Sequence, residues 1–309
     1  MLGTSIRDDR AASAAGKGIE WPTLALTAVV YTLFGLLTWW HTELPWWLIL
    51  PLGGYLVCLH GSLQHEAVHG HPTRWPLVNE ALVFPSLWLW MSFRIYRDSH
   101  LRHHRNEVLT DPGEDPESFY VTPQAWARMG PLKRAFLIAN NAFLVRLVIG
   151  PLVAVWQHWS DEIGRLARGD RRHLPAWALH LAGCALVFAW VIGVCGIPLG
   201  EYILLYAYPA LALTLIRSFL EHRARPEAET RSVIVEAGPV MSLLFLNNNL
   251  HALHHAHPGV AWYRLPALYR ARRDELLTRN GGYRYGGYLE IAGRYLLRPK
   301  EPVLHPYST

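Results

Sequence analysis

Residues 21–40 read WPTLALTAVVYTLFGLLTWW, and after the short link 41–44 residues 45–62 read PWWLILPLGGYLVCLHGS. Each run is apolar and long enough for a helix to cross about 30 Å of hydrocarbon. Because the link between them is so short, the two runs predict a helical hairpin in a membrane. The runs 176–195 and 201–220, joined by GIPLG, predict a second hairpin of the same kind.

The composition of the 309-residue chain also indicates a membrane protein. Hydrophobic residues make up 51% of it and charged residues only 17%, with 14 Trp and 14 Tyr, two types that are enriched at membrane interfaces. The formal net charge of +5 comes from Lys and Arg beside apolar runs and not from a basic stripe. We therefore expect anionic lipid headgroups as the partners of this charge, and no nucleic acid.

The distribution of Lys and Arg predicts how the hairpins are oriented. Neither link contains Lys or Arg, whereas the segments that flank both hairpins do, so the flanks are expected in the cytoplasm. Two further apolar stretches, 75–93 and 135–156, then begin and end on the same side of the membrane. They are interpreted as interfacial or re-entrant helices. Arg146, in the middle of the stretch 135–156, would also be costly at the bilayer centre.

The predicted fold is therefore all-α and integral to the membrane. It has four transmembrane helices in two hairpins, interfacial helices, and a cytoplasmic cap that carries the histidine motifs described next. We expect residues 1–309 to form a single domain of a multi-pass protein of the cell membrane. The polar segment 1–20 lacks the apolar core of a signal peptide and is expected to be cytoplasmic. The cap and tail, residues 221–309, are expected on the same side.

Histidines gather where the predicted spans meet the cap. The stretches QHEAVHGH, HLRHH and HALHHAHP use the spacings i, i+3 and i+4, which share one face of a helix. Their clustered members are His65, His69, His100, His103, His104, His251, His254 and His255. Each cluster is expected to aim its imidazoles at one point, without His71 and His257, which lie off the cluster faces. Imidazoles suit iron, zinc, copper and nickel, and these are too many for one tetrahedral zinc, so the pattern predicts a polynuclear metal site.

Three features have two possible interpretations. HEAVH, residues 65–69, is also the signature of zinc peptidases with Glu66 as general base, although such a site leaves HLRHH and HALHH unexplained. The acidic turn DPGEDPE, residues 111–117, is either a solvated loop or a source of carboxylates that orient imidazoles. His222, alone at the end of the fourth predicted span, is by its spacing more typical of a helix cap than of a metal ligand.

With HEAVH, HLRHH and HALHH in this order on a four-span frame, residues 21–265 resemble the membrane fatty acid desaturase and hydroxylase family. The resemblance implies a site with two irons whose ligands are the eight clustered histidines. In the acyl-CoA desaturase branch of that family the fourth span carries one more ligand histidine, and His222 occupies the matching place. The same branch has an Asn one turn earlier, where this chain has Ser218.

The resemblance further implies an oxidoreductase that uses O2 to desaturate an unactivated C–C bond, first of all in a fatty acyl or lipid substrate. The alternative is a hydroxylase, ketolase or desaturase of a carotenoid or small polar metabolite, and the second alternative is a membrane zinc peptidase. A fused cytochrome b5 domain, present in some relatives, is not apparent. Electrons are therefore expected from an external carrier of the ferredoxin, rubredoxin or cytochrome b5 type.

Overall fold

The computed structural model of the chain describes residues 18–308. Most of the polar segment 1–20, predicted to be cytoplasmic, therefore lies outside the described residues. The described part is mostly helical, and its strands are one short parallel pair. The expectation of an all-α membrane protein is confirmed by this helical content together with helices long and apolar enough to cross a bilayer.

The four predicted spans are present as four long apolar helical segments. The first hairpin consists of α2 (Trp21–Trp39), the turn η1 (His41–Glu43) and α3 (Trp46–Val68). The third span is α9 (Leu174–Phe188), which continues as the π-helical turn η3 (Ala189–Val194), and the fourth is α10 (Leu199–Tyr202), the π-helical turn η4 (Ile203–Ala207) and α11 (Tyr208–Ser218). The main difference from the expected boundaries is that α3 continues beyond residue 62 to Val68, which carries the first histidine motif on the span itself.

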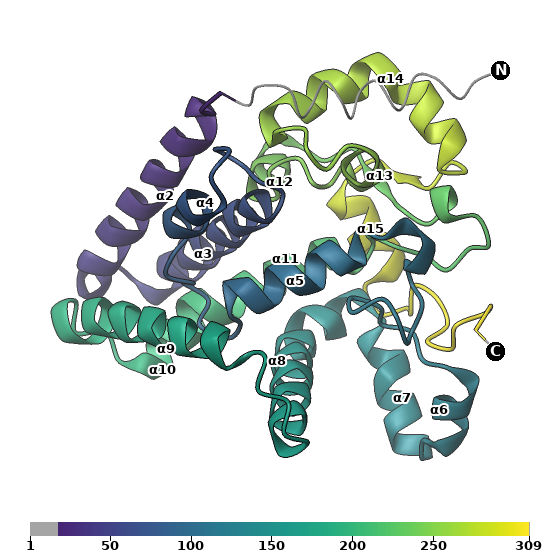
Figure 1. Cartoon of the computed structure of the whole chain (residues 1–309), viewed down its shortest axis with the longest axis horizontal. Coiled ribbons are helices and arrows are strands. Elements are labelled where there is room, and N and C mark those ends of the chain that lie inside the picture. The colour runs from purple at the N-terminus through teal and green to yellow at the C-terminus, as the bar shows by residue number, and fades with distance from the viewer. Residues whose placement is uncertain (1–17, 309) are drawn as a thin grey trace.

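The two hairpins pack side by side because small residues allow close backbone approach. A Cβ atom added at Gly53 would lie 2.7 Å from the Tyr206 ring, and one at Gly54 would lie 2.8 Å from Pro209 Cβ. The two turns lie at the same end of the bundle (Figure 1), where His41 Nε2 and Glu201 Oε2 are 3.0 Å apart. Both histidine-bearing ends, of α3 and of α11, therefore point away from these turns.

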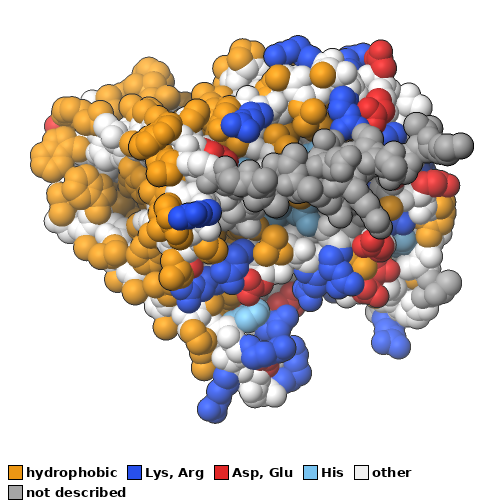
Figure 2. Space-filling view, turned by 45° about the horizontal axis from the view of Figure 1, so that its top comes forward, with side chains coloured by type: hydrophobic (Ala, Val, Ile, Leu, Met, Phe, Trp, Pro, Cys, Tyr) orange, Lys and Arg blue, Asp and Glu red, His pale blue; other side chains and the backbone are white. Residues whose placement is uncertain are grey.

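Apolar side chains cover the outer surface of the hairpins. Figure 2 shows them gathered over the side of the molecule where the hairpins lie, whereas charged side chains cover the opposite side. Trp47 is 62% exposed and Leu204 64% exposed on this surface. Contiguous apolar surface of this kind marks a membrane-contacting region, so the hairpins present a lipid-facing belt.

The two remaining apolar stretches form no candidate span. The first contains the short helix α4 (Pro76–Leu82), and the second lies in α7 (Pro131–Asn140) and α8 (Phe143–Ala167). Helix α8 runs across the direction of α9 (Figure 1) and exposes an apolar stripe: Leu144, Val148, Leu152, Trp156 and Ile163. An exposed stripe on a helix lying across the spans is typical of an interfacial helix, which supports that prediction for 135–156.

The remaining elements form a cap over the histidine-bearing ends of the hairpins. Before α8 it contains α5 (Phe93–His103), η2 (Asn106–Val108) and α6 (Pro123–Arg128). After α11 it contains η5 (Ala228–Thr230), β1 (Ile234–Val235), α12 (Pro239–Leu244), α13 (His251–Ala256), η6 (Trp262–Arg264), α14 (Leu265–Arg279), β2 (Arg284–Tyr285) and α15 (Tyr288–Tyr295). The last residues pack back onto the cap, with isolated bridges from Pro299 to Ala142 and from Leu304 to Val121.

The fold yields a topology prediction. We expect reporters inserted next to Glu43 or Gly196 to be extracytoplasmic, because neither turn carries Lys or Arg. Reporters placed after Arg168 or at the C-terminus should be cytoplasmic. Paired alkaline phosphatase and fluorescent-protein fusions measure this directly, and an extracytoplasmic C-terminus would contradict the predicted orientation.

Candidate metal centre

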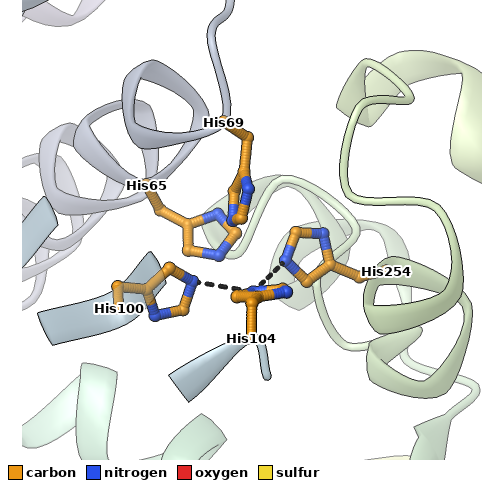
Figure 3. Close-up of side chains that lie close together, drawn as sticks. All are labelled: His65, His69, His100, His104 and His254. Atoms are coloured by element: carbon orange, nitrogen blue, oxygen red, sulfur yellow. Dashed lines mark hydrogen bonds between the residues drawn. The ribbon is translucent and has the colours of Figure 1, made fainter. Parts of the chain in front are cut away.

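Five of the predicted histidines converge at the junction of α3, α5 and α13. They are His65, His69, His100, His104 and His254, and their ligand atoms all lie within 4.8 Å of one another. Figure 3 shows their rings directed toward one another from separate helices. His104 Nε2 lies 3.0 Å from His100 Nε2 and 3.1 Å from His254 Nε2. We call these five residues the first group.

The other four predicted histidines form a second group beside the first: His103, His222, His251 and His255. Their ligand atoms also lie within 4.8 Å of one another, and all four residues are buried. His222 Nε2 lies 3.0 Å from both His103 Nε2 and His251 Nε2. All nine predicted histidines thus belong to one group or the other.

One expectation from the sequence needs correction, because the second and third clusters do not each aim at one point. His100 and His104, one turn apart on α5, face the first group, whereas the intervening His103 faces the second. On α13, His251 and His255 face the second group and His254 faces the first. Residues one position apart point about 100° apart around a helix, so α5 and α13 lie between the groups and contribute to both.

Carboxylates of the acidic turn orient two of these imidazoles. Glu117 Oε1 accepts from His100 Nδ1 at 2.8 Å, and Asp115 Oδ1 accepts from His103 Nδ1 at 2.8 Å. Asp115 is itself held by the backbone N–H groups of Thr110 and Glu117. Of the two interpretations of this turn, orientation of imidazoles is therefore the one that Asp115 and Glu117 satisfy. Asp111 instead accepts from the backbone N–H groups within the turn.

In the third cluster an amide side chain, that of Asn248, orients the imidazole of His251. His251 Nδ1 donates to Asn248 Oδ1 at 2.9 Å, and Asn248 Nδ2 lies 3.2 Å from His65 Nε2. Donation through Nδ1 fixes the tautomer and leaves Nε2 with a free lone pair for a metal. Asn248 lies in the run NNN, residues 247–249, just before the third cluster, but its role depends on a contact with His65 of α3, which is distant in sequence.

Burial determines the charge state of most of the cluster. It lowers the pKa of the buried imidazoles, with smaller contributions from neighbouring imidazoles, for His104, His222, His251, His254 and His255. A lowered pKa keeps an imidazole neutral, which is the form that binds a metal. His222, His251 and His255 of the second group therefore offer lone pairs where a buried positive charge would otherwise be costly.

His103 differs because carboxylates surround it. Burial opposes its protonation, but Glu117 and Asp115 raise the pKa of His103 to about 9. Burial likewise opposes the charge of Glu117, yet His103 and His100 hold the pKa of that carboxyl well below its usual range. Carboxylates behind a metal-binding imidazole increase the basicity of the ligand.

His222 does not act as a helix cap. It lies beyond the end of α11, where its backbone forms a bridge with Ser232, and its Nδ1 is 3.1 Å from Ser232 Oγ. Lys300, from the C-terminal tail, donates to the carbonyl oxygens of Phe219 at 3.1 Å and His222 at 2.8 Å. Lys300 is buried and is a residue that the sequence pattern did not identify, since the tail carries no motif.

A buried ion pair between Arg217 and Glu221 also lies beside the second group. Arg217 Nε is 2.6 Å from Glu221 Oε1, and that carboxylate oxygen is 3.4 Å from His251 Nδ1. Glu221 also lines a cavity of about 40 Å³ together with Glu117 and His222. A volume of that size holds a water molecule when polar groups surround it. Carboxylates and a water-sized space therefore lie directly beside the second group.

Three other residues of the histidine motifs have different partners. His71 Nδ1 is 2.7 Å from Glu20 Oε1, and His257 Nε2 is 3.2 Å from Arg272 Nη1. Neither belongs to a metal-binding group in the described part of the chain. Glu66, the general base of the zinc peptidase interpretation, accepts from the backbone N–H of Trp262 at 3.2 Å and so connects α3 to the segment after α13.

Comparison with models of protein families gives a match to this chain. The family model described as fatty acid desaturase matches residues 38–287, which include both histidine groups. Curated proteins give no match.

The contacts of Asp115 generate a prediction about metal affinity. An Asn at this position cannot accept from both His103 and the Thr110 N–H, because one of its two terminal atoms is a donor. We expect Asp115→Asn to weaken metal binding by about 10–100-fold, the usual cost of losing a carboxylate behind a ligand imidazole. Metal titration of purified protein measures the effect. Asp111→Asn, on the same turn but without a histidine contact, is the matched control, and an equal loss in both variants would contradict the assignment.

Proposed function

The chain belongs to the fatty acid desaturase family, and on this premise we propose that it is a membrane di-iron oxidoreductase. It uses O2 and externally supplied electrons to desaturate an unactivated C–C bond of a fatty acyl or other lipid chain. The balanced reaction converts a –CH2–CH2– unit, O2, two electrons and two protons into a –CH=CH– unit and two waters.

The observation that carries this proposal is the division of nine histidines into groups of five and four. Two adjacent groups match two metal ions, whereas a single tetrahedral zinc needs at most four ligands. The donor set fits iron, because imidazole nitrogen suits it and the described groups contain no thiolate that would favour softer ions. The first group would hold one iron and the second group the other.

Within this proposal the metal supplies reduction of O2 and cleavage of an unactivated C–H bond, chemistry that side chains alone lack. The protein supplies position and protons. Glu117 and Asp115 hold His100 and His103 in place, and Asn248 does the same for His251. Glu221, beside the water-sized cavity and with its pKa raised by burial, is the carboxylate that would pass protons toward the second group.

The lipid substrate follows from the family and from the lipid-facing belt rather than from a cavity. The outcome at carbon depends on where the substrate lies relative to the metals, so hydroxylation is the alternative outcome.

We place the protein in the cell membrane with the cap in the cytoplasm, because the flanks of both hairpins carry the Lys and Arg. Product analysis tests the reaction: with lipid, O2 and a reductant, mass spectrometry should detect loss of two hydrogens per chain, and gain of one oxygen would indicate the alternative.

The position of Glu66 separates this function from a zinc peptidase. A peptidase loses its general base in Glu66→Gln and should become inactive. In the proposed enzyme Glu66 connects two segments through the Trp262 N–H, a contact that the amide oxygen of Gln can replace. We therefore expect Glu66→Gln to retain bound iron and a measurable fraction of O2-dependent turnover. A fully inactive variant that still holds its metal would contradict the proposal.

His222 provides a second test of the ligand assignment. As a member of the second group, His222→Ala should lose iron and turnover together, because the remaining imidazoles bind metal less tightly. His257→Ala is the matched control, since His257 lies in the third motif but outside both groups. Iron per chain, measured by plasma mass spectrometry, should fall in the first variant and not in the second. Wild-type iron content in His222→Ala would overturn its role as a ligand.

A further inference from the structure

A basic pocket lined by tyrosines lies in the cap behind His222. It has a volume of about 530 Å³, and its walls come from the segment after His222, from β2, α15 and the C-terminal tail. Its cationic side chains are Arg223, Arg225, Arg284, Arg294 and Lys300. Among the residues that line it, Glu301 is the only acid. We call this cavity the Arg223 pocket.

Part of this positive charge is neutralised by nearby carboxylates. Lys300 Nζ is 2.6 Å from Glu301 Oε1, and Arg294 Nη2 is 2.6 Å from Glu290 Oε1. Arg284 pairs with Glu236. Only the Lys300 side chain is buried, at 4% exposed, whereas Arg284 and Arg294 stay partly exposed beside carboxylates that offset their charge.

Two arginines of the pocket differ, because no ion pair among the described residues neutralises them. Arg223 stacks on Tyr283, with the guanidinium carbon 4.2 Å from the ring centroid, and donates to the Thr230 and Asn280 carbonyls. Arg225 is exposed. Neither forms an ion pair with a carboxylate of the residues that the structure describes. Tyr and Arg in this combination are the residue types enriched in the energetic centres of protein interfaces.

The pocket is connected to the second metal group by the backbone. Arg223 follows His222 directly, and Lys300 donates to the His222 carbonyl oxygen at 2.8 Å. Tyr283 Oη donates to the Leu220 carbonyl oxygen at 2.7 Å. The pocket wall and the second group therefore share one short segment of chain. In Figure 1 α15 and the tail also lie on the side of the cap away from α2 and α9, so the membrane leaves this region accessible.

We propose that the Arg223 pocket is the docking surface for an acidic one-electron carrier protein, an inference that rests on the proposed function. A cationic surface steers an acidic partner toward it and fixes its orientation. Each reduced carrier that docks gives up one electron and leaves oxidised, and two such encounters supply the two electrons that the reaction consumes with O2. A carrier docked at Arg225 and Arg223 delivers them beside His222, the residue that precedes Arg223.

Binding measured without turnover tests this surface. The full chain in nanodiscs of uncharged lipid is titrated with an acidic [2Fe–2S] ferredoxin at low and at physiological ionic strength. We expect Arg225→Glu to weaken binding roughly tenfold at low salt, as reversal of an interface charge does, with a smaller difference at higher salt. Arg225→Lys keeps the charge and should bind nearly as the wild type does. Arg270→Glu changes an exposed arginine of α14 that does not line the pocket and is the matched control.

Turnover separates this inference from the proposed function. The rate supported by ferredoxin is divided by the rate supported by a small chemical reductant, and this ratio should fall in Arg225→Glu but not in Arg270→Glu. Equal weakening by both charge reversals, or unchanged binding in Arg225→Glu, would overturn the docking surface. So would a wild-type protein that binds anionic lipid vesicles through Arg225 but not the carrier. Carrier binding that depends on Arg225 in a protein inactive with every reductant would preserve the docking surface and overturn the proposed oxidoreductase.

Discussion

Buried imidazole nitrogens with facing lone pairs are the constraint on which the rest of this structure depends. His222 Nε2 lies 3.0 Å from Nε2 of both His103 and His251, and the Nδ1 atoms of those two already donate to oxygen. His222 Nε2 holds either one hydrogen or one lone pair, so it cannot pair well with both neighbours, and an unpaired polar atom is costly when buried. A cation bound between the rings would resolve the conflict. It would also explain why α3, α5, α13 and the segment after α11 all direct histidines to one junction.

The surrounding residues follow from the same constraint. Cations in a buried site require nearby negative charge, and Asp115, Glu117 and Glu221 provide it next to the second group. Arg217 then limits the net charge through its ion pair with Glu221, whereas Lys300, which pairs with Glu301, holds the His222 carbonyl in place. The membrane hairpins supply rigidity, because close contacts at Gly53 and Gly54 hold α3 against the fourth span. The site thus rests on packed helices rather than on loops.

The sequence predicted the structural features that depend only on residues close together in the chain. Long apolar runs identified the four spans, since hydrophobic length alone determines whether a helix can cross a bilayer. The i, i+3, i+4 spacing identified eight of the histidines that the structure brings together. Whether the turn at 111–117 reached the site stayed open, because its carboxylates contact α5 only after the chain reverses.

Long-range contacts explain what the sequence could not predict. His222 looks like a helix cap until Ser232 pairs with its backbone and ring. The spacing within HLRHH puts His100, His103 and His104 near one face, but metal-binding partners approach α5 from two sides and divide them. Asn248 and Lys300 act through contacts with α3 and α11, and neither position carries a recognisable motif.

X-ray absorption at the iron edge of the purified wild-type protein, together with metal analysis, identifies the bound metal and its ligand atoms. We expect about two irons per chain, each in a shell of imidazole nitrogens without sulfur. We also expect the spectrum to change when the protein is reduced, because the metal takes up the electrons. A single zinc per chain, or iron bound mainly by oxygen or sulfur, would contradict the claim that the nine histidines hold two irons.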